Sequence, residues 1–280
     1  MIDKKDLIRL RKITHLGIAK CNKALIATKG NIEEAIKLLR KEGAKIAAKR
    51  VNRSMDAGRV FVKLSEDSTR GVMLGLGCET DFVAKNESMQ ALGEKLATIA
   101  LENSARSKEE LLEKTYEEIA TCSDELVQLA GRVGENVALV SYGYFEAPLI
   151  GFYIHTGNKL GAVATLNTAT HDQEDLPKLA RDIAMQVVVR DPIAINEAKI
   201  NPTLLANEKE LILTQLEKLP ESQKANLDKF VERGIAKFVK ENTLIAQEFI
   251  HNEKVSVGKH LKSISPTLEV LEIARMHMGI

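Results

Sequence analysis

The segment of residues 71–78 constrains the fold most, because it is apolar and rich in glycine and stops abruptly at Glu79. Residues 65–68, Ser-Glu-Asp-Ser, precede it, and residues 60–64 form another mostly apolar run. Two apolar runs on either side of a short polar segment predict a β-hairpin. We expect the second strand of this hairpin to end near Asp81.

Phe82 follows this strand, and a helical pattern begins near Asn86. The aromatic ring is therefore placed in a connection between a strand and a helix, where binding residues concentrate on a rigid scaffold. The alternative is that Phe82 fills the nearby core, since burying a phenyl ring stabilises a protein by about 2 to 3 kcal/mol. The residues alone leave both interpretations open.

At 280 residues the chain is long enough for two or three small domains, each with a modest core. Its three cysteines, Cys21, Cys78 and Cys122, form no Cys-x-x-Cys pair, which argues against a disulfide framework or a zinc site. The N-terminus has no apolar leader, and no apolar stretch has membrane-spanning length. We therefore expect a globular, cytoplasmic protein without a membrane anchor.

Charge is distributed unevenly along the chain. Residues 1–53 contain 15 Lys and Arg against 5 Asp and Glu, a net of +10 in a chain whose total is +1. Such asymmetry is typical of proteins with an acidic partner, either nucleic acid or an acidic protein surface, and a solvated basic face is the alternative. Phe61 is the only aromatic residue near this segment, so a platform for stacking RNA bases is poorly supported.

Three short helices are predicted within residues 1–53, where apolar residues recur at helical spacing. Asn31 followed by Glu34 three positions later is a capping signal for the third helix. We expect this helix to stop at Gly43. Residues 44–57 are rich in Ala, Lys and Arg, and we expect them to tether a compact three-helix bundle to a separate body.

Residues 54–198 are predicted to form a two-part core, with one part at 54–145 and the other at 146–198. Each part contains antiparallel strands followed by helices, a plan that resembles an internal duplication. Gly157 and Asn158 suit a tight turn between two strands of the second part. The other predicted elements are strands at 137–145, 149–155 and 160–166 and helices after Asn86, at 116–130 and at 179–187.

Residues 199–240 are predicted to form a helical hairpin, because apolar residues recur on one face on both sides of Pro220. About two heptads on each side are too few for a free-standing coiled coil, so its seam is expected to meet the body or a second protomer. Residues 241–280 are expected to return to the second part of the core, with an edge strand at 268–274. The predicted fold class is α+β.

The sequence lacks the motifs of several chemistries. Its glycines form neither a phosphate-binding Gly-x-x-x-x-Gly-Lys motif nor a dinucleotide fingerprint, so the chain itself is not expected to hold GTP. The six histidines have no metal-ligand spacing, so no metal or other cofactor is expected. Glu79 and Asp81 could act as paired carboxylates, but a partner contact is more economical because no histidine or serine lies nearby. We expect a protein that is not an enzyme.

Several further patterns accompany residues 71–86: Leu10-Arg11, Thr14, Gly17, Lys23-Ala24-Leu25, Tyr153-Ile154-His155, Gly161, Ile183-Ala184-Met185 and Val257-Gly258. Together they closely resemble the elongation factor Ts family, whose members are guanine nucleotide exchange factors of the translational GTPase elongation factor Tu. The resemblance spans most of the chain. It implies an N-terminal bundle that is UBA-like (ubiquitin-associated-like) and a helical hairpin that serves in dimerisation or partner contact.

The same resemblance implies roles for the four residues Thr80, Asp81, Phe82 and Val83. Phe82 would wedge into elongation factor Tu and shift the helix that supports its magnesium ion, so that GDP leaves and GTP can rebind. Asp81 would make a polar contact, cap the following helix, or do both. Thr80 and Val83 would position the ring.

Further contacts are implied for Arg11, Ile18, the loop around His15, and His155, although His155 could equally be a hairpin residue without a partner. The sequence departs from the family pattern at His15, Lys20 and Gly77, which puts the N-terminal docking in doubt more than the wedge. One alternative function is an RNA- or ribosome-binding module that uses the basic bundle. Another, a ubiquitin-like-domain adaptor, would leave residues 58–198 unexplained.

Overall fold

The computed structural model describes residues 3–14, 16–117, 120–168, 175–217 and 227–279. Its first three helices are α1 (Lys4–Thr14), α2 (Ile18–Ala27) and α3 (Ile32–Arg50). Leu10, Leu25 and Leu39 are buried between them. The side chain of Asn31 accepts the N–H of Glu34 at 3.1 Å, which confirms the predicted cap of the third helix.

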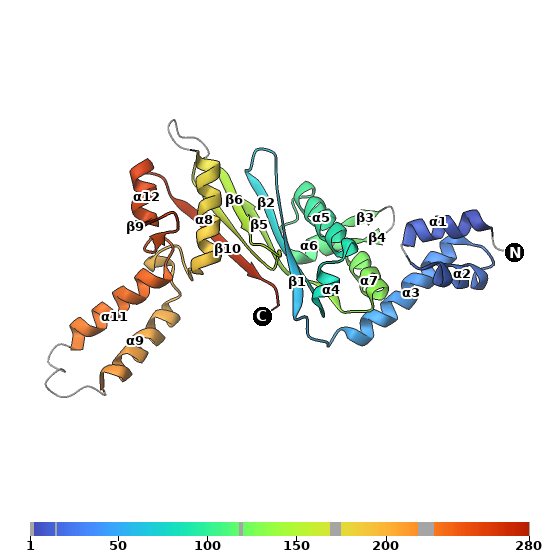
Figure 1. Ribbon diagram of the computed structural model, residues 1–280, viewed down its shortest axis with the longest axis horizontal. Helices are drawn as coiled ribbons and strands as arrows, with labels where there is room; N and C mark the ends of the chain where they lie inside the picture. The colour runs from blue at the N-terminus through green and yellow to red at the C-terminus, as the bar shows by residue number, and fades with distance from the viewer. Residues whose placement is uncertain (1–2, 15, 118–119, 169–174, 218–226, 280) are drawn as a thin grey trace.

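The prediction that α3 stops at Gly43 is wrong, because α3 continues to Arg50 and includes much of the expected tether. Gly43 lies where α3 crosses α7 (Cys122–Val133). A Cβ atom added to Gly131 of α7 would lie only 2.6 Å from the Cα of Gly43. The two glycines therefore allow close packing of two helices, and this contact joins the N-terminal helices to the rest of the molecule (Figure 1).

The first sheet contains β1 (Ala57–Leu64), β2 (Arg70–Cys78) and β5 (Val137–Glu146) in the order β1-β2-β5, with antiparallel pairing throughout. The predicted hairpin is confirmed, but β2 ends at Cys78 rather than near Asp81. Helices α5 (Glu87–Glu102) and α7 cover one face of this sheet. Gly93 of α5 lies directly against the ring of Phe61.

The helix predicted at 116–130 begins later than expected. Tyr116 belongs to β3 (Thr115–Glu117), which follows α6 (Lys108–Glu113) and pairs with β4 (Ala120–Thr121). Helix α7 then starts at Cys122, because Thr121 and Asp124 form a capping box there. It ends at Val133, and Gly134 supplies the left-handed C-cap with a φ of 73°.

The second sheet contains β6 (Leu149–Ile154), β7 (Leu160–Leu166) and β10 (Val270–His277) in the order β10-β7-β6. The hairpin β6–β7 turns through Gly157 and Asn158, both at positive φ, as predicted. The predicted edge strand is also confirmed, since β10 pairs only with β7 among the described strands. Helix α8 (Leu176–Arg190) covers one face.

The two sheets pack against each other through their remaining faces, as Figure 1 shows. The buried side chains between them are Val60, Met73, Phe145, Ala147, Ile150, Val163 and Met278. One backbone hydrogen bond joins the sheets at one edge, from Val60 N of β1 to Asn158 O in the β6–β7 turn at 2.7 Å. The core is thus four layers deep, with helices outside and sheets inside, and the fold class α+β is confirmed.

The remaining described segments are the short η1 (Glu197–Lys199), α9 (Pro202–Glu217), α11 (Leu227–Asn242), β8 (Glu248–Phe249), β9 (Asn252–Ser256) and α12 (Val257–Ile264). Helices α9 and α11 form the predicted helical hairpin, although Leu219 and Pro220 lie outside the described residues. The hairpin projects from the end of the molecule opposite to α1–α3 (Figure 1). Among the described residues, no helix has both the length and the apolar character that crossing a membrane requires.

Candidate partner-binding site

Phe82 lies on α4 (Asp81–Ala84), a single helical turn between β2 and α5. Its side chain is 89% exposed, the largest exposure among the described large hydrophobic residues. Its neighbours Val83 and Ala84 are buried in the core beneath the first sheet's helices. The turn directs successive side chains to different sides, so the ring points outward, and the alternative that Phe82 fills the core is excluded.

Thr80 forms the N-cap of α4, and Glu135 holds it. The backbone N–H of Thr80 donates to one carboxylate oxygen of Glu135 at 3.0 Å, and the Thr80 hydroxyl donates to the other at 2.7 Å. The Thr80 oxygen also faces the Val83 N–H at a long 3.5 Å. Glu135 was not singled out from the sequence, where its local signal is its place after the helix-ending Gly134.

Glu79, the first residue after β2, connects three segments of the molecule. Its carboxylate accepts the backbone N–H of Asn136 at 2.7 Å and pairs with Arg50 at 3.1 Å and Arg53 at 3.4 Å. The Asn136 N–H, followed by the Arg50 guanidinium, holds the pKa of Glu79 below its ordinary value of 4.5. The Glu79 carboxylate thus binds groups where α3 and the residues after it meet the core, and it does not act together with Asp81.

Asp81 makes an ion pair with Lys159, with 2.7 Å between Oδ1 and Nζ. This contact, more than any other, lowers the pKa of the Asp81 carboxyl. The alternative that Asp81 caps the following helix is wrong, because Asn86 caps α5 by accepting the Ser88 N–H at 2.8 Å. Lys159 was not singled out from the sequence, since its partner comes from the other half of the core.

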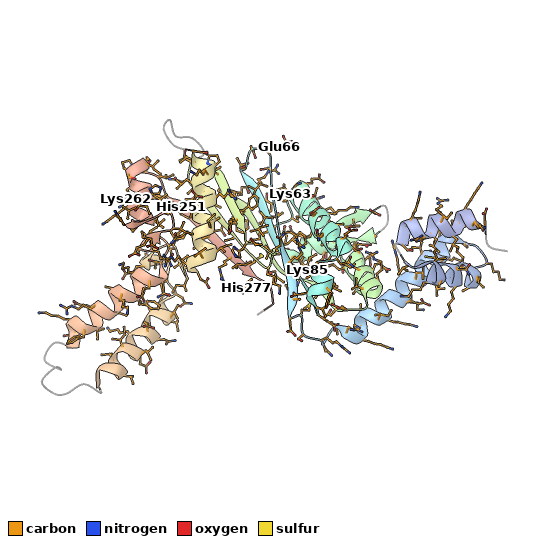
Figure 2. The ribbon with its side chains drawn as sticks, in the orientation of Figure 1. Lys63, Glu66, Lys85, His251, Lys262 and His277 are labelled. Carbon is orange, nitrogen blue, oxygen red and sulfur yellow. The ribbon has the colours of Figure 1, made fainter. Side chains whose placement is uncertain are left out.

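His155 lies at the same β6–β7 turn as Lys159. The structure therefore brings the predicted histidine close to the end of residues 71–86, the segment called the signature below. The His155 ring lies 3.2 Å from the hydroxyl of Tyr153, between Nδ1 and Oη, and is exposed. Figure 2 marks Lys85, the residue after α4, and His277, which pairs with Leu160 at the end of β10.

The other predicted contact residues lie elsewhere. Arg11 and Ile18 are exposed on α1 and α2, at the end of the molecule beyond α3 (Figure 1). Lys20 is exposed on α2, whereas His15 lies outside the described residues. Gly77 is buried in β2, and a Cβ atom there would lie 3.0 Å from Val140 and 3.1 Å from Met55. These two side chains leave little room for a larger residue in place of Gly77.

Cys78 supports the turn from inside. Its thiol donates to the carbonyl of Thr80 at 3.2 Å. Burial, reinforced by the negative charge of Glu135, raises the pKa of Cys78 to about 11. The thiol therefore stays protonated at neutral pH, where it packs and donates a hydrogen bond rather than reacting.

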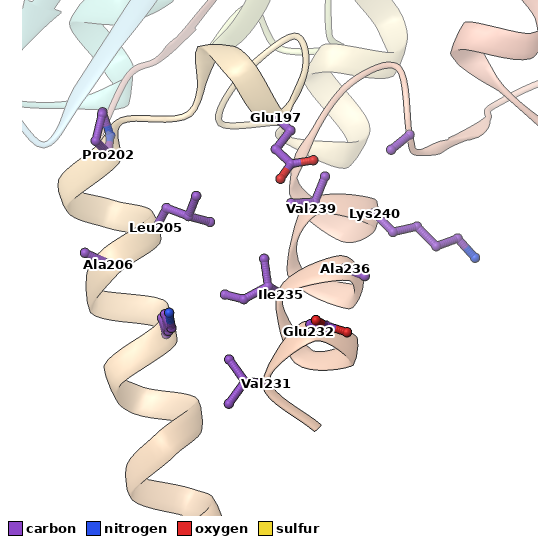
Figure 3. A pocket seen from close by; sticks show the side chains of 12 residues that line it. Glu197, Pro202, Leu205, Ala206, Val231, Glu232, Ile235, Ala236, Val239 and Lys240 are labelled. Atoms are coloured by element: carbon purple, nitrogen blue, oxygen red, sulfur yellow. The ribbon is translucent and has the colours of Figure 1, made fainter. Parts of the chain in front are cut away.

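Outside this region, a groove of about 700 Å³ lies between α9 and α11. Leu205, Val231, Ile235 and Val239 give it apolar walls, and Figure 3 shows their side chains between the two helices. The described residues contain no group of three His, Cys, Asp or Glu side chains that could hold a metal ion.

Comparison with known proteins explains the signature. The family model for elongation factor Ts matches residues 79–280. The chain belongs to the elongation factor Ts family. It is 36% identical over 276 residues to elongation factor Ts of Christiangramia forsetii, covering 98% of this chain and 97% of the relative. The corresponding protein of Amoebophilus asiaticus is 34% identical over 279 residues, covering 99% of both chains.

Elongation factor Ts of Chlorobaculum tepidum gives a similar result, with 35% identity over 288 residues and 99% coverage of both chains. The family model begins at Glu79, but these relatives align with the N-terminal helices as well. Membership confirms the family predicted from the signature and supports a role in translation elongation.

Proposed function

We propose that the protein is the guanine nucleotide exchange factor of elongation factor Tu and that it accelerates GDP release so that GTP can rebind. The observation that carries this proposal is the outward-pointing ring of Phe82 on a turn whose other side chains are anchored. An exposed phenyl ring on a fixed support gains about 2 to 3 kcal/mol when a partner buries it. Family membership supports the choice of that partner.

The proposed mechanism acts on the partner's magnesium ion. A translational GTPase holds GDP through a phosphate loop and a magnesium ion with hydroxyl and carboxylate ligands. Phe82 would enter between elements of elongation factor Tu and shift the helix that supports this ion. Asp81 would add a polar contact, while Thr80 and Val83 would hold the turn. The protein itself performs no covalent step and holds no nucleotide in this scheme.

One ring does not suffice for exchange. A ten-thousandfold shift between two states requires about 5.5 kcal/mol of differential affinity. By reciprocity, the nucleotide must weaken the binding of the factor as strongly as the factor weakens nucleotide binding. We therefore assign further contacts to His155 beside the signature and to Arg11 and Ile18 on the N-terminal helices.

Stopped-flow release of fluorescent GDP from elongation factor Tu tests the proposal. Phe82→Ala should reduce the stimulated rate at least tenfold, which corresponds to about 1.4 kcal/mol. Phe152→Ala is the matched control, because Phe152 is also an exposed phenylalanine but lies on β6. A stimulated rate that survives Phe82→Ala unchanged would remove the wedge, and absence of stimulation by the natural protein would remove the function.

The RNA- or ribosome-binding alternative rests on the positive charge of residues 1–53. Part of that charge is already matched within the protein, because Arg50 and Arg53 pair with Glu79. We therefore do not propose it. The prediction that the helical hairpin contacts the body, a partner or a second copy stays a prediction, and the groove between α9 and α11 is the surface on which to test it (Figure 3).

A further inference from the structure

The helix that carries Phe82 is too short to hold its own shape. It has four residues, and its backbone bonds near the cap run from Ala84 N to Thr80 O and from Lys85 N to Asp81 O, both at 3.1 Å. Isolated helices are marginal below about 12 to 15 residues. The direction of the exposed ring must therefore come from the groups that hold the two ends of the turn.

At the C-terminal end of α4, Val83 and Ala84 are held by burial in the core. At the N-terminal end, Asp81 pairs with Lys159 at a substantially exposed position, and Glu135 uses both carboxylate oxygens on one residue, the N-cap Thr80. Hydrogen bonds to an ionised group are about twice as strong as neutral ones. By accepting the hydroxyl proton, Glu135 also turns the Thr80 oxygen so that its lone pair can face the Val83 N–H.

Glu135 is itself held by a rigid framework. β2 and β5 pair as far as Cys78 and Val137, and the next residues continue the link through their side chains. Glu79 accepts the N–H of Asn136, while Glu135 accepts the N–H of Thr80. The two carboxylates thus bind each other's segment reciprocally, and each lies within one or two residues of a paired strand.

The left-handed C-cap of α7 brings Glu135 to this position. Gly134 has a φ of 73°, and its N–H donates to Ala130 O at 2.9 Å. This conformation reverses the chain immediately before Glu135, between α7 and β5. A residue with a Cβ would be strained there.

We propose that Glu135 is a positioning residue for nucleotide exchange: through Thr80 it fixes the one-turn helix that presents Phe82. This inference rests on the proposed function, because the presented ring is assumed to act on elongation factor Tu. Glu135 touches neither the partner nor its nucleotide in this scheme. Its loss should therefore lower the maximal rate of GDP release more than the affinity of the factor.

The test uses two independent measurements on the full-length protein. The chain contains no tryptophan, so Phe82→Trp creates a single tryptophan fluorophore at the tip of the turn. Its fluorescence anisotropy reports how freely the side chain moves when no partner is present. Stopped-flow release of fluorescent GDP, measured over a range of factor concentrations with Phe82 retained, separates the maximal rate from the half-saturating concentration.

We expect Glu135→Ala to lower the anisotropy of the tryptophan reporter and to reduce the maximal rate of GDP release about fivefold to tenfold. The half-saturating concentration should change less than twofold. Glu135→Gln keeps an acceptor and should restore part of both signals, and it remains informative if Glu135→Ala does not fold. In a Thr80→Val background the effect of Glu135→Ala should shrink, because one of its two hydrogen bonds is already absent.

Glu146→Ala is the matched control, since this carboxylate is likewise held by a residue distant in sequence, Arg106 at 2.8 Å, but lies at the far end of β5. It should change neither signal. Unchanged anisotropy in both Glu135 variants would overturn the proposal whatever the exchange rate. Lowered anisotropy with an unchanged maximal rate would also overturn it. If the natural protein does not accelerate GDP release, the proposed function fails, and the positioning role in exchange fails with it.

Discussion

The two halves of the core follow one topological plan, and one difference between them lies in the connection that follows the middle strand. In the first, β1 and β2 form a hairpin, helices follow, and β5 returns to pair with β2. In the second, β6 and β7 form a hairpin, helices follow, and β10 returns to pair with β7. The strand orders β1-β2-β5 and β6-β7-β10 are therefore equivalent, which supports the predicted internal duplication.

The equivalence extends to the residue that follows the middle strand. Glu79 follows β2 and accepts the N–H of Asn136, just before β5. Asn167 follows β7, accepts the N–H of Glu269 at 3.0 Å and donates to Thr267 O at 2.7 Å, just before β10. In both halves one side chain ties the middle strand to the segment entering the third strand. The first half uses a charged group, and the second uses a neutral amide.

The difference lies in what comes next. The first half continues into α4 and exposes Phe82, whereas the second half continues through a longer connection to α8. Among the described residues, the common framework thus carries the candidate site on the strand–helix connection of the first half. This is the general relation between fold and function, in which a site is added to a framework that does not itself specify it.

The largest expected effect compares how closely the helices pack against the sheet in the two halves. A Cβ at Gly151 of β6 would overlap backbone atoms of Ala180, which cannot move aside. A Cβ at Gly93 of α5 would overlap the tip of the Phe61 ring, which can tilt. We expect Gly151→Ala to lower the free energy of unfolding by about 3 kcal/mol. Gly93→Ala should cost about 1 kcal/mol, because alanine also favours the helix. Equal losses in urea unfolding would contradict this reading.

The second effect concerns neighbouring residues of α4. Val83 is 8% exposed, so Val83→Ala should lower the free energy of unfolding by about 2 kcal/mol. Phe82→Ala should change it by less than about 0.5 kcal/mol, because the ring has almost no contacts to lose. Chemical denaturation of both variants checks the contrast. A clear loss of stability in Phe82→Ala would show that the ring packs on its own subunit in solution.

Much of this framework was predictable because its signals are local. The two hairpins follow from apolar runs around polar turns, and the left-handed turn at Gly157 and Asn158 follows from residue type. The errors arose where packing overrides local preference. Gly43 has the residue type of a helix end, yet α3 continues through it because α7 needs close approach there.

The supports of the site were not predictable for the same reason. Glu135 is 55 residues from Thr80, and Lys159 comes from the other half of the core. Neither belongs to a motif with Phe82, so only the folded arrangement brings them together. The sequence identified the ring and its connection, and the structure adds the groups that hold them.

The third effect compares the charged side chain of Glu79 with the neutral side chain of Asn167, which follow the middle strands of the two halves. Because the pKa of Glu79 is lowered on folding, its carboxylate stabilises the protein above the ordinary value of 4.5, and this contribution is lost as the pH falls through the lowered value. Glu79→Gln should cost about 1 to 2 kcal/mol near pH 7 and progressively less below pH 4.5. Asn167→Ala should cost about 1 kcal/mol at every pH. Urea unfolding at several pH values checks this, and a pH-dependent cost of Asn167→Ala would break the comparison.

The smallest effect concerns the ion pair that joins the halves. Asp81 and Lys159 are both substantially exposed, so Lys159→Met should leave the melting temperature unchanged. If Asp81 contacts elongation factor Tu, that carboxylate must first leave Lys159. Lys159→Met should then lower the half-saturating concentration of the factor by up to about threefold at low salt. The gain should disappear at high salt and in an Asp81→Asn background, because both remove the competing attraction. An increase in that concentration would instead mean that the second half of the core holds α4 in place for the first.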